Sequence, residues 1–270
     1  MKIDKNKISK FRTKIRKFYR QHGRELPFRM IDDSYKVTVS EIMLQQTQVD
    51  RVIPKYNNWI HKFPNWQSLA QASNKEILTY WSGLGYNRRA IYLKNIAQIL
   101  VEEYNGKMPE DINTLQSFPG IGKYTSYAIL IFAFGKRLAT VDTNIRKVLL
   151  HEFNLSADIS DKEIQTLAEI VLPQTKIKEW HYALMDYAKT LPKEIHIKYQ
   201  TKYKQSKFEG SIRQIRGEII RQLTKNKFVT INEISINLKR TENDIKKAIE
   251  TLQYENIITL KKNKIYLNND

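Results

Sequence analysis

The 270-residue sequence contains no cysteine, which excludes disulfide bonds, thiolate metal sites and iron–sulfur clusters held by its own residues. Its five histidines are scattered, with no close pair at metal-ligand spacing. No apolar run approaches the ~18 residues of a membrane-spanning helix, and the basic start lacks an apolar stretch of signal-peptide length. We therefore expect a soluble cytoplasmic protein with no metal, no cofactor and no membrane contact.

Acidic residues are scarce relative to basic ones. Lys and Arg number 46 against 28 Asp and Glu, a formal net charge of +18, and the basic residues are spread along the whole chain. This balance favours a polyanionic partner, although a solvated lysine-rich surface would give the same composition. The length allows one large domain or two to three small ones.

The spacing of apolar residues predicts a mainly α fold. Apolar residues recur three and four positions apart over residues 8–19, 35–52, 75–80, 90–104, 124–134 and 143–150. Glycine and proline interrupt the chain between most of these stretches, and nothing before residue 205 alternates as a strand does.

The pattern changes after residues 191–207, a basic segment that predicts a connector over a surface. Residues 212–223 predict a helix, and Thr230 with Glu233 forms a capping box that opens a second helix. A third helix is predicted over residues 241–254, and residues 257–267 alternate as a hairpin does. This order resembles a winged-helix (α+β) domain over residues 208–270.

The third of these helices would face a DNA groove, as in other winged helices, although such domains also dock proteins. Its exposed basic and polar residues would be Lys239, Arg240, Asn243, Lys246 and Lys247.

Two short motifs point to chemistry in the first 207 residues. In FPGIGKYT (residues 118–125), Gly120 and Gly122 permit a sharp turn that brings backbone N–H groups to a phosphate, or merely joins two helices. In VDTN (residues 141–144), Asp142 stands at the start of a helix, where it could cap the helix or face a cleft.

The order and spacing of these motifs resemble the helix-hairpin-helix DNA glycosylase superfamily: FPGIGKYTSYAI is followed by FGK (residues 134–136) and then by VDTN. RELPFR (residues 24–29), YKV (35–37), SEIMLQQTQV (40–49), IP (53–54) and GLGY (83–86) are similar to the MutY adenine glycosylases. The resemblance covers residues 10–190 and implies a two-subdomain helical core over 1–207, with a six-helix subdomain about 30–137, a second from 1–29 plus 138–190, and the connector 191–207.

The resemblance assigns catalytic roles to two carboxylates. Glu41 would protonate the purine and Asp142 would stabilise the cationic sugar, which suits the residue types because breaking an N-glycosidic bond needs both an acid and a negative charge. Superfamily members that also nick the strand carry a lysine where this chain has Tyr124. We therefore expect a monofunctional hydrolase that leaves an abasic site.

The resemblance also assigns DNA contacts, because the target base must leave the stack and a wedge must fill the gap. Gln46 and the loop of Gly85, Tyr86 and Asn87 are the wedge candidates, while Phe28 and Leu44 could instead be plain core residues. The expected base-pocket residues are Arg24, Phe28, Arg29, Leu44, Gln45 and Tyr182. The expected DNA-binding residues are Gly120, Gly122, Lys123, Thr125, Arg88, Lys246 and Lys247.

The sequence departs from the MutY pattern in three places. The cysteine loop is missing from residues 190–208, the C-terminal domain is too short for the family's oxidised-guanine reader, and Asn87 and Tyr182 replace the usual pocket and wedge residues. Adenine opposite guanine or 8-oxoguanine remains the expected substrate. Thymine or uracil opposite guanine is the alternative, since Tyr124 and Asn87 also resemble the archaeal thymine mismatch glycosylase.

A non-catalytic DNA-binding protein is the alternative of another class, but a pure binder gains nothing from two carboxylates near phosphates. We expect a monomer acting on mismatched or damaged double-stranded DNA at the nucleoid.

Overall fold

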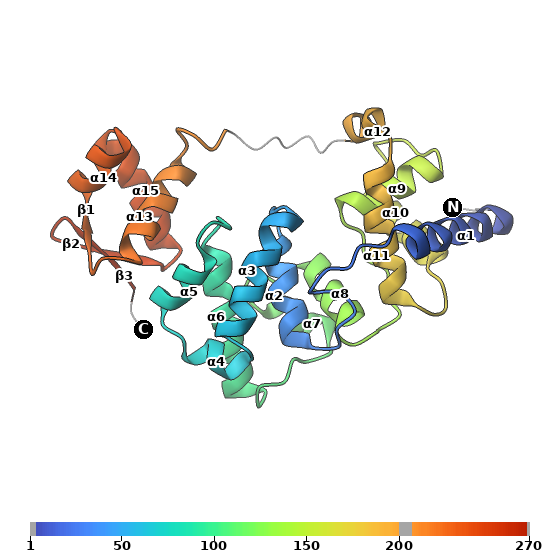
Figure 1. Ribbon diagram of the computed structural model, residues 1–270, viewed down its shortest axis with the longest axis horizontal. Coiled ribbons are helices and arrows are strands. Elements are labelled where there is room, and N and C mark those ends of the chain that lie inside the picture. The colour runs from blue at the N-terminus through green and yellow to red at the C-terminus, as the bar shows by residue number, and fades with distance from the viewer. Residues whose placement is uncertain (1–3, 200–206, 269–270) are drawn as a thin grey trace. The chain divides into compact units, whose positions relative to one another are not determined.

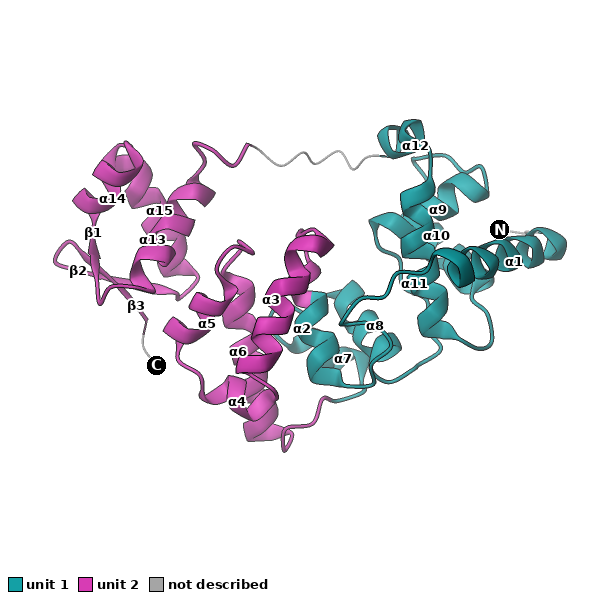
Figure 2. Cartoon of the chain, in the orientation of Figure 1, with its two compact units in different colours: residues 1–41, 109–203 teal, residues 42–108, 204–270 magenta. Residues whose placement is uncertain are grey.

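The computed structural model describes residues 4–199 and 207–268 (Figure 1). All strands in these ranges lie after residue 207, so the prediction of a mainly helical chain is confirmed. The chain forms two compact units, residues 1–41 with 109–203 and residues 42–108 with 204–270 (Figure 2). These units are bounded differently from the expected domains, which stay a prediction.

The first unit is helical, and its core forms where α1 packs against α11. The ring of Phe11 meets the rings of Phe153 and Trp180 edge-on, with centroids 5.2 and 5.6 Å apart. The elements are α1 (Lys5–His22), α2 (Ser34–Leu44), α7 (Ile112–Ser117), α8 (Lys123–Phe132), α9 (Thr143–Glu152), α10 (Asp161–Val171), α11 (Ile177–Tyr187), the 3-10 turn η1 (Ala188–Thr190) and α12 (Lys193–Lys198).

Short polar residues start several of these helices by accepting hydrogen bonds from backbone N–H groups that have no partner inside the helix. Asp111 caps α7, Asp142 caps α9, and Ser160 with Glu163 forms a capping box on α10. The first part of the expected connector is folded, because it contains α12 and its Leu191 and Tyr199 are buried. The rest of it, residues 200–206, lies outside the described residues.

The second unit contains a helical part built around aromatic side chains. Trp59, Phe63 and Trp81 are almost fully buried and meet edge-on, with ring centroids 5.0 and 5.5 Å apart. Its helices are α3 (Val49–Lys62), α4 (Trp66–Gln71), α5 (Asn74–Trp81) and α6 (Arg88–Glu103).

The expected single helix over residues 35–52 is wrong, because the structure divides it into α2 and α3. Between them Gln46 adopts a positive φ of 53°, which no helix continues through. A distant side chain, Arg89, stabilises this break by donating to the carbonyl oxygens at the end of α2.

The C-terminal part of the second unit has the helices and hairpin that the sequence predicts. Both halves of the capping box between Thr230 and Glu233 are present, and Lys262 and Asn263 turn the hairpin with positive φ. The strands form an antiparallel sheet in the order β1-β3-β2. The elements are α13 (Ile212–Leu223), β1 (Val229–Thr230), α14 (Ile231–Leu238), α15 (Glu242–Tyr254), β2 (Ile258–Lys261) and β3 (Lys264–Leu267).

Candidate active site

Asp142 combines the two roles that the sequence left open. One carboxylate oxygen accepts the backbone N–H of Ile145 at 2.6 Å and so caps α9, while the other accepts the side-chain amide of Asn144 at 2.9 Å. The side chain is half-buried and lines a recess in the first unit. Capping fixes the direction of the carboxylate and leaves it facing that recess.

Glu41 of α2 lies near Asp142, and the hydroxyl of Tyr124 donates a hydrogen bond to it. Burial, together with the negative charge of Asp142, raises the pKa of Glu41 to about 7. Burial and the two carboxylates hold the pKa of Tyr124 well above its usual value. At neutral pH the site therefore contains a tyrosine hydroxyl that keeps its proton and a glutamic acid ready to lose one.

The carboxylate of Asp142 has stabilising contacts of its own. Burial raises its pKa, but the N–H of Ile145, the amide of Asn144 and the positive charge of Lys147 oppose that rise. The charge of Asp142 in turn raises the pKa of Glu41. The two carboxyl groups therefore have different surroundings: the contacts of Asp142 favour its ionised form, whereas the charge of Asp142 favours the protonated form of Glu41.

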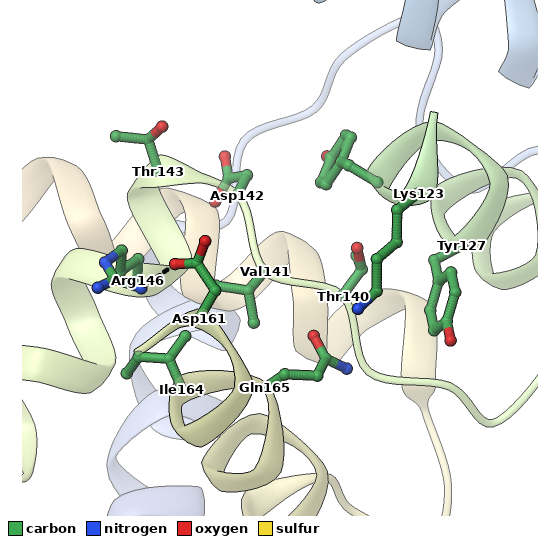
Figure 3. Close-up of a pocket in the computed structure, with 11 residues that line it drawn as sticks. Lys123, Tyr127, Thr140, Val141, Asp142, Thr143, Arg146, Asp161, Ile164 and Gln165 are labelled. Atoms are coloured by element: carbon green, nitrogen blue, oxygen red, sulfur yellow. Dashed lines mark hydrogen bonds and ion pairs between the residues drawn. The ribbon is translucent and has the colours of Figure 1, made fainter. Parts of the chain in front are cut away.

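The recess beside Asp142 has a volume of about 320 Å³ (Figure 3). Asp142 and Thr143 stand at one end, whereas the Lys123 side chain runs along the side that carries Thr140 and Tyr127. Arg146 also lines the recess but is bound to Asp161 at 2.8 Å. A carboxylate and a lysine side chain thus line the same recess.

The segment that leads into Asp142 is held from two sides. The backbone N–H of Thr140 donates to Nε2 of the buried His181 at 3.2 Å, and Nδ1 of that ring lies 2.8 Å from the carbonyl of Ile177. Burial lowers the pKa of His181 to about 4, so the ring is neutral at physiological pH and can accept the Thr140 hydrogen bond. Gln165 donates to the carbonyl of Ala139 at 2.8 Å.

Arg24 and Arg29, expected to line the base pocket, share a carboxylate partner that was not predicted. Asp186 of α11 accepts hydrogen bonds from both guanidinium groups, at 2.6 Å from Arg24 and at 2.8 and 3.0 Å from Arg29. Burial would raise the pKa of Asp186, but the two arginines outweigh it and keep the pKa below its usual value. The guanidinium of Arg29 also lies 4.6 Å from the ring centroid of Tyr182. The positive charge of Arg29 also opposes the rise in the pKa of Glu41, so this cluster influences the carboxylate pair.

The hairpin between α7 and α8 has the expected turn. Gly120 adopts a φ of 77°, which favours glycine, but Gly122 has an ordinary φ of −90°. A Cβ at Gly122 would meet no atom within 4 Å. Neither backbone angle nor packing requires glycine there, which leaves room for another molecule to approach the N-terminus of α8. Lys123 at this end is exposed, and Thr125 is buried.

The wedge candidates Gln46 and Tyr86 lie on two turns of the second unit, and the buried side chain of Arg89 binds both turns. Arg89 donates six hydrogen bonds of 2.6 to 3.3 Å, five to backbone carbonyls and one to the hydroxyl of Thr47. The carbonyls belong to residues 42, 43 and 45 on one turn and to residues 84 and 85 on the other. Gln46 and Tyr86 are exposed on these turns with φ of 53° and 48°. Burial lowers the pKa of Arg89 to about 10, which still leaves it charged at neutral pH.

We predict that Arg89→Lys destabilises the protein although it keeps the charge. An ammonium group offers three donors on one atom and cannot reach carbonyls on both turns, so several buried acceptors would lose their partners. The expected loss is about 2 to 3 kcal/mol, seen as a fall of several degrees in the melting temperature. Arg88→Lys is the control, because Arg88 is exposed and only stacks on Tyr92. Equal melting temperatures for the two variants would show that the six hydrogen bonds contribute little.

The structure also places the other predicted residues. Phe28 is buried, Leu44 and Gln45 are half-buried, and Asn87 precedes α6 without capping it through its side chain. Lys246 and Lys247 are exposed on α15, but the prediction that Lys239 and Arg240 belong to this helix is wrong, because Lys239 ends α14 with a positive φ and Arg240 follows it in the loop. Sequence reasoning did not select Asp186, His181 or Arg89 as site residues, and only their partners elsewhere in the chain reveal them.

Comparison with known proteins identifies this arrangement. Residues 39–174, which contain Glu41, the hairpin and Asp142, match the HhH-GPD superfamily base excision DNA repair proteins. The chain belongs to this superfamily. The match covers half of the sequence and ends before the C-terminal sheet of this HhH-GPD protein.

Three curated relatives are named adenine DNA glycosylases. The protein from Mycolicibacterium smegmatis is 37% identical over 177 residues, the human protein 36% over 201 and one from Buchnera aphidicola 38% over 181. These alignments cover 64%, 70% and 65% of this chain but only 60%, 37% and 51% of the relatives. The HhH-GPD protein thus spans less than two thirds of the length of each.

Two solved structures share the fold. A thermostable thymine-DNA glycosylase is 29% identical with a TM-score of 0.63, over 69% of this chain and 88% of that one. A trapped endonuclease III–DNA covalent intermediate is 19% identical with a TM-score of 0.60, over 68% and 85% of the two chains.

The iron–sulfur cluster of MutY proteins does not fit this HhH-GPD protein, because the 270 residues offer no cysteine to hold it. Within residues 4–199 and 207–268, no three His, Asp or Glu side chains come together as metal ligands would. Over the same ranges, no helix is both long and apolar enough to cross a membrane.

Proposed function

We propose that the protein is a monofunctional DNA glycosylase of base excision repair that removes adenine mispaired with guanine or 8-oxoguanine. The observation that carries the proposal is the Glu41–Asp142 pair, in which burial and the charge of Asp142 raise the pKa of Glu41 to about 7, so that it can hold a proton for transfer. The names of the curated relatives support adenine as the base. The DNA partner is proposed from the net charge and from the hairpin.

The reaction follows from the two charge states. Glu41 transfers its proton to the adenine as the C1′–N bond breaks, so the bonding electrons leave with a neutral base rather than an anion. The carboxylate of Asp142 stabilises the positive charge that remains on the sugar. Water then adds to C1′, and its proton returns to Glu41. The product is an abasic site, and Tyr124 supplies no amine for strand cleavage.

Three further parts of the proposal concern the rest of the chain. Gln46 and Tyr86 would fill the space that the flipped adenine leaves. Residues 208–270 would form a winged-helix domain beside a glycosylase core over 1–207. The protein would act as a monomer without a cofactor.

Thymine or uracil removal from mispairs with guanine is the second candidate. It is favoured by the 29% identity to the thymine-DNA glycosylase, together with Tyr124 and Asn87. A non-catalytic DNA-binding protein is the third, and the raised pKa of Glu41 argues against it because a structural carboxylate gains nothing from a proton near pH 7.

The deciding experiment measures single-turnover base release from four duplexes that carry A·8-oxoguanine, A·G, T·G or U·G, before and after alkali. We expect strand breaks at adenine that appear only after alkali. Release of thymine or uracil instead would move the enzyme to the second candidate. Breaks without alkali would contradict the monofunctional mechanism, and binding without any release would favour the third candidate.

A further inference from the structure

The C-terminal sheet exposes one face to solvent. In the antiparallel pairs Lys261 lies opposite Lys264 and Thr259 opposite Tyr266, so these four share a face. Neighbouring positions alternate to the other side, where Val229, Ile258 and Ile265 are buried at 1%, 2% and 0% exposure. The exposed face is therefore polar and basic, with β3 in the middle of the sheet and β2 at one edge (Figure 1).

Lysines and aromatic rings interleave on this face. Nζ of Lys264 lies 4.1 Å from the ring centroid of Phe228, and that ring lies 5.8 Å from the ring of Tyr266 at an angle of 45°. Lys262 stands at the tip of the hairpin in a positive-φ turn. We name this the lysine–aromatic face; its residues are Phe228, Lys261, Lys262, Lys264 and Tyr266.

Among the described residues, Lys261, Lys262 and Lys264 form no ion pair with a carboxylate. Residues 224–230 and 258–268 contain no Asp or Glu, and the carboxylate of Glu233, which reaches Thr230 opposite Lys264, is engaged in the capping box of α14. The exposed side of α15 differs, because its lysines have acidic neighbours. Lys246 lies 3.6 Å from Glu242, and the same helix also carries Asp244 and Glu250. The positive potential of this part of the chain is thus concentrated on the sheet rather than on its third helix.

We propose that the lysine–aromatic face is a DNA-binding surface that contacts phosphates, and that it carries more of the DNA affinity of residues 207–268 than α15 does. Lysine ammonium groups neutralise phosphates without reading sequence, and partly exposed rings can stack on bases or sugars. The proposed function enters only in the choice of DNA as the polyanion. Contact there would hold the enzyme on DNA whether or not a damaged base is present.

The test compares two variants of the full chain that lose the same charge. One is Lys261→Gln, Lys262→Gln, Lys264→Gln, and the other is Lys239→Gln, Lys246→Gln, Lys247→Gln on the helix side. Fluorescence anisotropy gives the Kd for an undamaged 20-base-pair duplex and for a 20-nucleotide single strand at several KCl concentrations. The slope of log K against log salt is negative, and each lost phosphate contact makes it less steep by about 0.9. The slope of the sheet variant should therefore be less steep than that of the wild type by up to ~2.7.

We expect the sheet variant to bind the duplex at least about tenfold more weakly at 0.1 M salt, with a smaller loss for the helix variant. The matching triple Lys→Arg variant of the sheet should keep the wild-type slope, which excludes misfolding as the cause. A greater loss in the helix variant, or equal losses in both, would overturn the proposal. Tighter binding of the single strand, reduced by Tyr266→Leu, would support the face with stacking as its main contact.

Base release by the wild-type chain is measured on the same preparation. A chain that releases base but shows equal losses in both variants refutes the face alone. A chain that binds through the face but releases no base refutes the proposed function alone. Absence of any DNA binding by the wild-type chain refutes both.

Discussion

Asp142→Asn is expected to lower the rate of base release by about 10²- to 10⁴-fold while the protein stays folded. General acid catalysis contributes about 10²- to 10⁴-fold, or roughly 3 to 5.5 kcal/mol, whereas enzymatic acceleration begins at about 8 kcal/mol. Asp142 must therefore supply about 2.5 to 5 kcal/mol by stabilising the cationic sugar. Asparagine keeps the shape and loses the charge.

The substitution separates the two roles of Asp142. Asparagine caps helices as well as aspartate does, so its side-chain oxygen should still accept the N–H of Ile145 and α9 should keep its start. Asp111→Asn is the matched control, because Asp111 caps α7 in the same way, with the N–H of Thr114 at 2.8 Å. Single-turnover rates and melting temperatures are measured for both. Full activity in Asp142→Asn would reduce this residue to a helix cap.

Glu41→Gln is expected to lower the rate by about 10²- to 10⁴-fold at pH 6, because glutamine has no proton to give. The wild-type enzyme needs Glu41 protonated and Asp142 ionised, so its rate should fall about tenfold per pH unit well above pH 7 and should also fall in acid where Asp142 takes up a proton. The residual rate of the variant should not show the alkaline fall. Glu163→Gln is the control, since a capping box accepts glutamine at that position.

The same variant should be more stable than the wild type in alkali. A carboxyl group whose pKa is raised on folding favours the folded state below its unfolded pKa of 4.5, and that advantage is lost as the pH rises through about 7. Glutamine carries no charge to bury, so Glu41→Gln should melt at a higher temperature than the wild type above pH 7. A lower melting temperature there would mean that the ionised Glu41 is well stabilised, which contradicts its role as an acid.

The sequence predicted the features that depend on local pattern. The capping box at Thr230, the hairpin turn at Asn263 and the Asp142 cap all involve residues within three or four positions of one another, where side-chain chemistry and spacing determine the geometry. That Glu41 and Asp142 lie close together was predicted only through the family resemblance, since no local pattern connects residues about a hundred positions apart.

The features that the sequence did not predict depend on long-range partners. Apolar spacing runs on across residues 35–52, and the break at Gln46 is held by Arg89, three of whose carbonyl partners lie 44 to 47 positions away. The pairing of Arg29 with Asp186 spans 157 positions. Such contacts produce no periodic pattern in the sequence, because the sequence around an arginine does not reveal which distant acceptors it will bind.

The Arg89 arrangement has a consequence for which substitutions the two turns should tolerate. Five of the six acceptors are backbone carbonyls, which every amino acid provides, so these hydrogen bonds do not depend on which side chains the two turns carry. The demand on the side chains comes instead from the backbone, because Gln46 and Tyr86 both adopt a positive φ, and from the Tyr86 ring, whose centroid lies 5.6 Å from the Arg89 guanidinium. Residues that accept a left-handed backbone, such as Asn or Gly, should therefore replace Gln46 at the least cost in stability, whereas β-branched residues should be poorly tolerated there.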